Sequence, residues 1–175
     1  NISVLICHFP ERRPSSYFYA DQYSYVVYNS KYTAGWIEKR WGFVPHQHIY
    51  PPVDMDANQA VKSKIQKEKL ILSVARFEES GTKKQKELVS AFIKMNQQFP
   101  KEAADWKFVL IGGSTERNRY LDELRQMIQN SRLANVEIFT NVDSDTLKAY
   151  YQKATLFWHL CGLNQTEPEK VEHFG

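Results

Sequence analysis

Three basic residues beside a predicted strand are the first candidates for chemistry. Arg76 ends an apolar run, and Lys83 and Lys84 open an amphipathic segment. Thr82 followed by Gln85 is a capping-box pattern, which predicts that a helix begins there with both lysines in its first turn. Lysines oppose the helix dipole at that end, whereas an anion is stabilised there. The pattern predicts a phosphate site, and the alternative is a solvated basic surface softened by nearby glutamates.

Regular elements are expected around these cations. Apolar strands are predicted at 70–75, 107–111, 136–139 and 155–159, and amphipathic helices at 83–99, 117–130 and around Leu147, Tyr150, Tyr151 and Ala154. Strands that alternate with helices over short connections are typical of an α/β fold, a doubly wound parallel sheet with Rossmann-like repeats. Ligands bind such sheets beyond the carboxyl ends of the strands, where the strand order reverses. We expect that crevice between the first and fourth strands, where His159 and the loop after it would meet the cations.

The upstream part has a different pattern. Strands are predicted at 2–7 and 25–28, and Asn29-Ser30 can cap a helix over 31–41 that ends at Gly42. Residues 45–66 contain Pro51-Pro52 and a lysine-rich stretch, which favours an extended connector. The predicted organisation is therefore residues 1–44, a connector at 45–66, and a second lobe at 67–175.

Three further pairs of residues have two readings each. Gly112-Gly113 after the second strand either lets a ligand approach the backbone or makes a tight turn, and both readings carry equal weight. Asn141 and Val142 after the third strand either precede a helix cap or face a nucleotide base with their backbone. His46 and His48 are favoured as solvated polar residues over metal ligands, since no other ligand is near them in sequence.

Composition narrows the class of protein. The 175 residues carry 23 basic and 20 acidic side chains, a net charge of +3, which is too balanced to indicate nucleic acid or a membrane surface. The two cysteines are far apart, which favours reduced thiols in a cytosolic protein. No nucleophile elbow, dinucleotide fingerprint or Walker loop occurs in the sequence. The chain does not begin with Met, so we expect a fragment or a truncated chain.

Five ordered motifs together resemble a known family. They are VVYNSKYTAGWIEKRWG with IYPPVD, LSVARFEESGTKKQKELVSAF, FVLIGG, NVEIFTNVDSDTLKAYYQKA and WHLCGLNQTEPEKVEHFG. In this order they resemble the C-terminal, donor-binding lobe of a family 4 (group 1) glycosyltransferase, a retaining enzyme of the GT-B fold. Residues 1–44 resemble the tail of the acceptor lobe of that fold. Residues 67–175 would then be an incomplete nucleotide-sugar lobe.

The resemblance implies that a sugar is transferred from a nucleotide-diphosphate donor to an acceptor hydroxyl with retention. Arg76 and Lys83 match the family's diphosphate-holding cations and would stabilise the leaving group. Glu172 matches the first glutamate of a paired motif and would contact the donor sugar. These three are the expected catalytic residues. The further substrate-binding residues are expected to be Lys84, Gly112, Gly113, Asn141, Val142, His159, Phe174 and Gly175.

The sequence departs from the family pattern at several places. Ala75 and Lys84 stand where glycines are common. The second glutamate of the pair and most of the acceptor lobe lie outside the chain, so we expect the polypeptide alone to be inactive. The expected partners are a nucleotide sugar and a sugar or lipid-linked acceptor, without metal, cofactor or nucleic acid. The expected setting is the cytoplasm, with peripheral membrane contact through the missing lobe, in polysaccharide or glycolipid synthesis.

Two other functions remain open from sequence alone. A nucleotide-sugar 2-epimerase uses a similar fold but needs a different arrangement of carboxylates and histidine. A non-catalytic α/β nucleotide-binding module of the receiver type would carry acidic residues at the end of the first strand of the second lobe, where this chain has Arg76.

Overall fold

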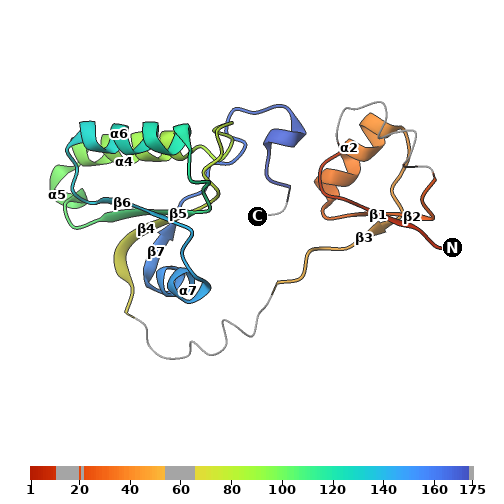
Figure 1. The fold of residues 1–175 in the computed structure, drawn as a ribbon, viewed down its shortest axis with the longest axis horizontal. Helices are drawn as coiled ribbons and strands as arrows, with labels where there is room; N and C mark the ends of the chain where they lie inside the picture. The colour runs from red at the N-terminus through yellow and green to blue at the C-terminus, as the bar shows by residue number, and fades with distance from the viewer. Residues whose placement is uncertain (11–19, 21, 54–65, 174–175) are drawn as a thin grey trace. The chain divides into compact units, whose positions relative to one another are not determined.

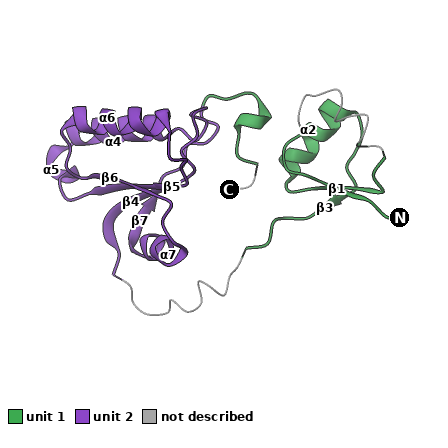
Figure 2. Ribbon diagram, viewed as in Figure 1, with its two compact units in different colours: residues 1–58, 164–175 green, residues 59–163 purple. Residues whose placement is uncertain are grey.

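The computed structural model describes residues 1–10, 20, 22–53 and 66–173. It divides into two compact units: residues 1–58 with 164–175, and residues 59–163 (Figure 2). The predicted boundaries at 44 and 66 differ from this division, and residues 164–175 group with unit 1 instead of the second lobe. The assignment of the units to acceptor and donor lobes remains a prediction.

Unit 2 is built on a parallel sheet, as predicted. In the part that the structure describes, β4 (Glu68–Val74), β5 (Lys107–Gly112), β6 (Val136–Thr140) and β7 (Ala154–Phe157) pair in the order β6-β5-β4-β7. The chain adds β5 and β6 on one side of β4 and then returns to place β7 on its other side. The strand order therefore reverses at β4, which ends just before Arg76.

Helices cover both faces of this sheet (Figure 1). The helices α4 (Gln85–Gln98) and α6 (Arg119–Ser131) lie on one face and α7 (Ser144–Lys153) lies on the other; α5 (Pro100–Ala103) is a short turn after α4. Alternate strand residues supply the two cores because successive side chains point to opposite faces. Ile71, Phe108 and Leu110 pack with α4 and α6, whereas Leu70, Leu72, Val109 and Ile111 pack towards α7.

The start of α4 differs from the prediction. The helix begins at Gln85, and Lys84 is its N-cap in the left-handed region with φ 59°. No side chain caps it, and the Thr82 hydroxyl instead donates to Glu78 Oε2 at 2.8 Å. The predicted capping box is wrong, and both lysines precede the helix instead of lying in its first turn. Another boundary differs at Ala154, which begins β7 and is not part of α7.

Unit 1 contains a smaller parallel sheet of β1 (Val4–Cys7), β2 (Tyr25–Tyr28) and β3 (Gln47–His48), with α2 (Lys31–Trp41) packed on it. The predicted limits of β2 and α2 are confirmed. The side chain of Ser30 accepts from the Thr33 N–H at 3.1 Å, and Gly42 ends the helix at φ 75°. The strand β3 lies inside the stretch predicted as a connector.

A short 3₁₀ turn, η1 (Pro168–Lys170), belongs to unit 1. None of the helices in the described ranges combines the length and the apolar character needed to cross a bilayer.

Candidate functional site

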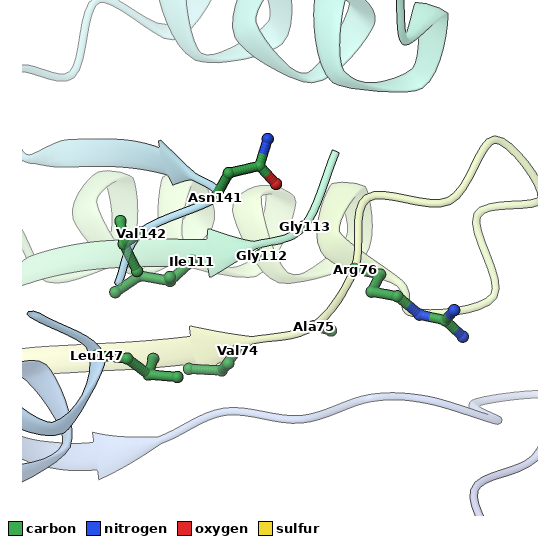
Figure 3. Close-up of a pocket in the computed structure, with 9 residues that line it drawn as sticks. All are labelled: Val74, Ala75, Arg76, Ile111, Gly112, Gly113, Asn141, Val142 and Leu147. Atoms are coloured by element: carbon green, nitrogen blue, oxygen red, sulfur yellow. The ribbon is translucent and has the colours of Figure 1, made fainter. Parts of the chain in front are cut away.

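A cavity of about 480 Å³ opens in unit 2 at the carboxyl ends of β4, β5 and β6. Its lining residues are Val74, Ala75, Arg76, Ile111, Gly112, Gly113, Asn141, Val142 and Leu147. Apolar side chains form one side of it, and the Arg76 side chain extends past the end of β4 (Figure 3). Parallel α/β folds bind ligands at these carboxyl ends of the strands. The cavity is not the predicted crevice between β4 and β7, because neither β7 nor His159 is among its lining residues.

The two glycines that line the cavity differ in what an added side chain would contact. A Cβ added to Gly112 would lie 1.9 Å from the Ala75 carbonyl oxygen, so the backbone after β4 occupies the space of a side chain. A Cβ on Gly113 would meet only Arg76 Cγ and Asn141 Oδ1, each at 3.8 Å, which is ordinary contact. Gly112 is therefore required by packing, whereas a side chain at Gly113 would make only ordinary contacts at the cavity.

Asn141 joins two of the loops that line the cavity. Its backbone is left-handed at φ 54°, a conformation that asparagine tolerates better than most residues. Its side-chain Oδ1 accepts from the Ser114 N–H at 3.0 Å, and its Nδ2 donates to the Ser114 carbonyl at 3.0 Å. The side-chain amide thus holds the loop after β5, and the Asn141 backbone N–H also donates to the Gly112 carbonyl at 3.0 Å.

Arg76 is the charged residue of the cavity. Its side chain is 77% exposed, and Nη2 lies 2.9 Å from Glu78 Oε1. An exposed pair of this kind contributes about 0–1 kcal/mol, so an incoming anion can replace the glutamate at little cost.

The two predicted lysines lie differently. Lys83 Nζ is 3.7 Å from Cys161 Sγ, so the loop after β4 contacts the loop after β7. Lys83 is not among the residues that line the cavity. Lys84 Nζ lies 3.3 Å from Glu87 Oε1, and its side chain is largely covered. His159 is exposed after β7, with its ring stacked on Phe157.

Three buried polar residues that the sequence analysis did not assign to the site hold the backbone around Arg76. Gln85 Nε2 donates to the Arg76 carbonyl at 3.0 Å. Asn118 Nδ2 donates to the Phe77 carbonyl at 2.6 Å, and the Tyr120 hydroxyl donates to Gln85 Oε1 at 3.2 Å. Burial raises the pKa of the Tyr120 hydroxyl, which keeps it a donor. A polar residue at an otherwise apolar helix position is the signal that could have found Gln85.

Glu172 belongs to unit 1 and is partly buried there. Its neighbour His173 is buried: Nε2 donates to the Pro168 carbonyl at 2.7 Å, and Nδ1 lies 2.6 Å from the Thr33 hydroxyl. Arg40 on α2 pairs with Glu169 and, at 3.4 Å, with Glu167. These contacts hold the segment that carries Glu172 on α2. Phe174 and Gly175, also predicted as binding residues, lie outside the described residues.

Residues 166–173, which these contacts hold on α2, are expected to loosen in acid. Burial lowers the pKa of the His173 imidazole below its ordinary 6.5, while the Pro168 carbonyl, Glu172 and Glu169 act the other way and Arg40 adds to the lowering. The released ring binds a proton more readily than the docked ring, so docking is strongest above pH 6.5 and weakens as the pH falls below it. Hydrogen exchange of residues 166–173, corrected for intrinsic rates, should be faster at pH 5 than at pH 7.

The variant His173→Gln is the control for this prediction. It removes the titrating group, so the pH dependence of exchange between pH 5 and pH 7 should become smaller. An equal pH dependence in wild type and variant would contradict the assignment to His173.

Comparison with known proteins gives the family. The sequence profile of the family described as "Glycosyl transferases group 1" matches residues 54–175. No curated protein matches the chain in sequence.

Solved structures resemble the chain in fold. TarM has a TM-score of 0.70 at 14% identity, over 91% of this chain and 32% of its own. A UDP-forming α,α-trehalose-phosphate synthase from Burkholderia vietnamiensis has a TM-score of 0.64 at 16% identity, over 98% of this chain and 50% of its own. A mutant of S. aureus TarM in complex with fondaparinux, α-GlcNAc-glycerol and UDP has a TM-score of 0.62 at 15% identity, over 90% of this chain and 32% of its own.

The chain spans about a third to a half of these structures, and the likeness shows a shared GT-B-type α/β fold. The family profile covers more than half of the chain. The chain therefore belongs to the glycosyl transferases group 1 family.

Proposed function

We propose that unit 2 is the donor-binding part of a retaining glycosyltransferase that moves a sugar from a nucleoside-diphosphate donor to an acceptor hydroxyl. The observation that carries the proposal is the cavity at the carboxyl ends of β4, β5 and β6, with an exposed arginine among its lining residues. It opens at the carboxyl ends of the strands, the end at which α/β folds bind ligands. The match to the group 1 family supports the same reading.

Arg76 and Lys83 hold the diphosphate in this proposal. Negative charge develops on the diphosphate as the sugar bond breaks, and fixed cations lower the energy of that state. The guanidinium of Arg76 suits phosphate because its fork of N–H donors matches two phosphate oxygens. Two cations supply the neutralising charge that a divalent metal would otherwise give, so we propose that donor binding needs no metal.

The base would lie against the apolar side of the cavity. Val74, Ile111 and Leu147 offer the surface for a flat ring, and we assign the edge of the ring to the side of the cavity lined by Asn141 and Val142. The glycine backbone of Gly113 provides the close floor. The Asn141–Ser114 hydrogen bonds fix the shape of this part of the cavity.

Glu172 is assigned to the donor sugar in this proposal. A carboxylate accepts hydrogen bonds from sugar hydroxyls, and His173 and Arg40 hold its segment on unit 1. Lys84 and His159 are proposed to lie near the phosphates and the sugar. Phe174 and Gly175, which follow Glu172 in sequence, are also proposed to bind the donor. The acceptor is proposed to be a sugar or a lipid-linked sugar, with peripheral membrane contact at the inner face of the membrane.

Nucleotide binding to the purified chain tests the proposal. UDP is the first probe because two of the solved structures above carry it in their names or complexes, and GDP is the second. At a hundredfold excess over the dissociation constant, the nucleotide should raise the unfolding free energy by about 2.7 kcal/mol. Thermal unfolding should show this gain equally with and without EDTA. A chain that neither nucleotide stabilises would contradict the proposal.

A further inference from the structure

We infer that Gln85 is a positioning residue for the diphosphate site, because it fixes the backbone of Arg76 relative to the turn that carries Lys83. The inference rests on the proposed function. It assigns a role to a buried amide that follows both cations in sequence and is not among the residues that line the cavity at the ends of β4, β5 and β6.

The side chain of Gln85 is fully enclosed and fully bonded. It is 1% exposed, at the first residue of α4. Its Nε2 donates to the Arg76 carbonyl at 3.0 Å and lies 3.5 Å from the Ala75 carbonyl. Its Oε1 accepts from the Tyr120 hydroxyl, which in turn accepts from the Lys86 N–H at 3.2 Å. A buried amide is costly unless bonded, so this arrangement is strongly specified.

The bonded backbone is the part of the chain that places Arg76. The N–H groups of Ala75 and Phe77 continue the pairing with β5, donating to the Ile111 and Gly113 carbonyls. The carbonyls on this stretch instead receive side-chain amides, from Gln85 at Arg76 and from Asn118 at Phe77. The exposed Arg76 side chain therefore starts from a backbone held by buried groups.

The same side chain also fixes the Lys83 turn. Lys84 has a left-handed backbone, and its N–H donates to the Gly81 carbonyl at 3.1 Å, so the turn has its own defined shape. Gln85 follows this turn directly and carries its bond back to the Arg76 carbonyl. One buried amide thus ties together the two segments whose cations must reach one diphosphate.

The test compares two substitutions, each of which removes a side-chain hydrogen bond to a backbone carbonyl. One bond lies at the carboxyl ends of the strands and the other at their amino ends. Gln85→Met keeps the length of the side chain and removes the amide. Asn135→Leu is the matched control, because Asn135 Nδ2 donates to the Trp106 carbonyl at 2.8 Å just before β5 and β6 begin. UDP affinity is measured by calorimetry and uridine affinity by NMR titration.

The expected result distinguishes an effect on diphosphate binding from an effect on base binding. Gln85→Met should weaken UDP binding about tenfold, the equivalent of one misplaced charge-assisted hydrogen bond. It should leave uridine affinity unchanged, because the base side of the cavity does not depend on Gln85. Asn135→Leu should change neither affinity.

Tyr120→Phe is a second variant that tests the same role if Gln85→Met does not fold. It removes the hydroxyl that holds Gln85 Oε1, so it should weaken UDP binding in the same direction and by less. UDP binding as in wild type in both variants would overturn the inference and leave the proposed function standing. Equal losses for UDP and uridine would also overturn it. A wild-type chain that binds no nucleoside diphosphate would overturn both.

Discussion

Replacing Arg76 with methionine is expected to weaken UDP binding about tenfold to a hundredfold, since each charge-assisted hydrogen bond contributes about 1.5–3 kcal/mol. The side chain is exposed beyond the end of β4 and lines the cavity, so its loss removes charge without disturbing a core. Lys83→Met should give a loss of the same kind. Calorimetric titration with UDP measures both.

Lys69→Met is the matched control for this charge. Lys69 lies near the amino end of β4, the strand that leads to Arg76, and its side chain is 57% exposed and pairs with Asp105 at 3.0 Å. Its loss changes the net charge equally but should leave UDP affinity within about twofold, since charges beyond a Debye length of about 8 Å are largely screened. Equal effects of the two substitutions would mean that UDP responds to overall charge, and the site at Arg76 would be refuted.

Glu78→Gln is expected to change UDP affinity in the opposite direction. Glu78 Oε1 lies 2.9 Å from Arg76 Nη2 and competes with a phosphate for the guanidinium. The variant removes that competitor and one negative charge beside the site. UDP should therefore bind a few-fold more tightly, consistent with the modest strength of an exposed pair.

The sheet and the helices were predictable because their signals are local. The alternation of apolar runs and amphipathic segments predicts β4, β5, β6 and β7 within a few residues, and the known strand order of such folds places the reversal at β4. In unit 1, the Ser30 cap and Gly42 stop gave α2 its limits because both act through backbone groups a few residues away.

The start of α4 was not predictable because a long-range contact decides it. Thr82 and Gln85 have the right types and spacing for a capping box, but Gln85 bonds the Arg76 carbonyl and Thr82 bonds Glu78. The Lys86 N–H that would lie in an open anion seat is taken by the Tyr120 hydroxyl, 34 residues later. Sequence spacing contains no information on a partner that reaches the helix from another element.

The hydrogen bond from the Lys86 N–H to the Tyr120 hydroxyl affects where a phosphate can bind. An anion was expected at the N–H groups of α4, drawn there by the helix dipole. Since Tyr120 covers part of that helix end, the proposed phosphate binding depends on the side chains of Arg76 and Lys83 instead. The substitutions of Arg76 and Lys83 therefore have larger expected effects than any change at the helix start itself.

The second large effect is expected on the stability of unit 2, at Gly112 in the lining of the cavity. Gly112→Ala is expected to destabilise unit 2 by about 3 kcal/mol, at the upper end of the cost of overpacking. The new methyl group would lie 1.9 Å from the Ala75 carbonyl oxygen and 3.2 Å from the Phe77 ring. The carbonyl belongs to backbone that is bonded to β5, so it cannot move without breaking the Ala75–Ile111 and Phe77–Gly113 hydrogen bonds. Urea unfolding measures the loss.

Gly113→Ala separates packing from binding at the adjacent residue. Its methyl group would meet neighbours at 3.8 Å, so the unfolding free energy should change by less than about 0.5 kcal/mol. Because the methyl group would still stand at the cavity lining, a nucleotide that approaches this backbone closely should bind more weakly to Gly113→Ala. An unchanged UDP affinity with unchanged stability would show that the ligand does not use this floor. A stable Gly112→Ala chain would show instead that the end of β4 can move aside, and the backbone that carries Arg76 would then not be fixed.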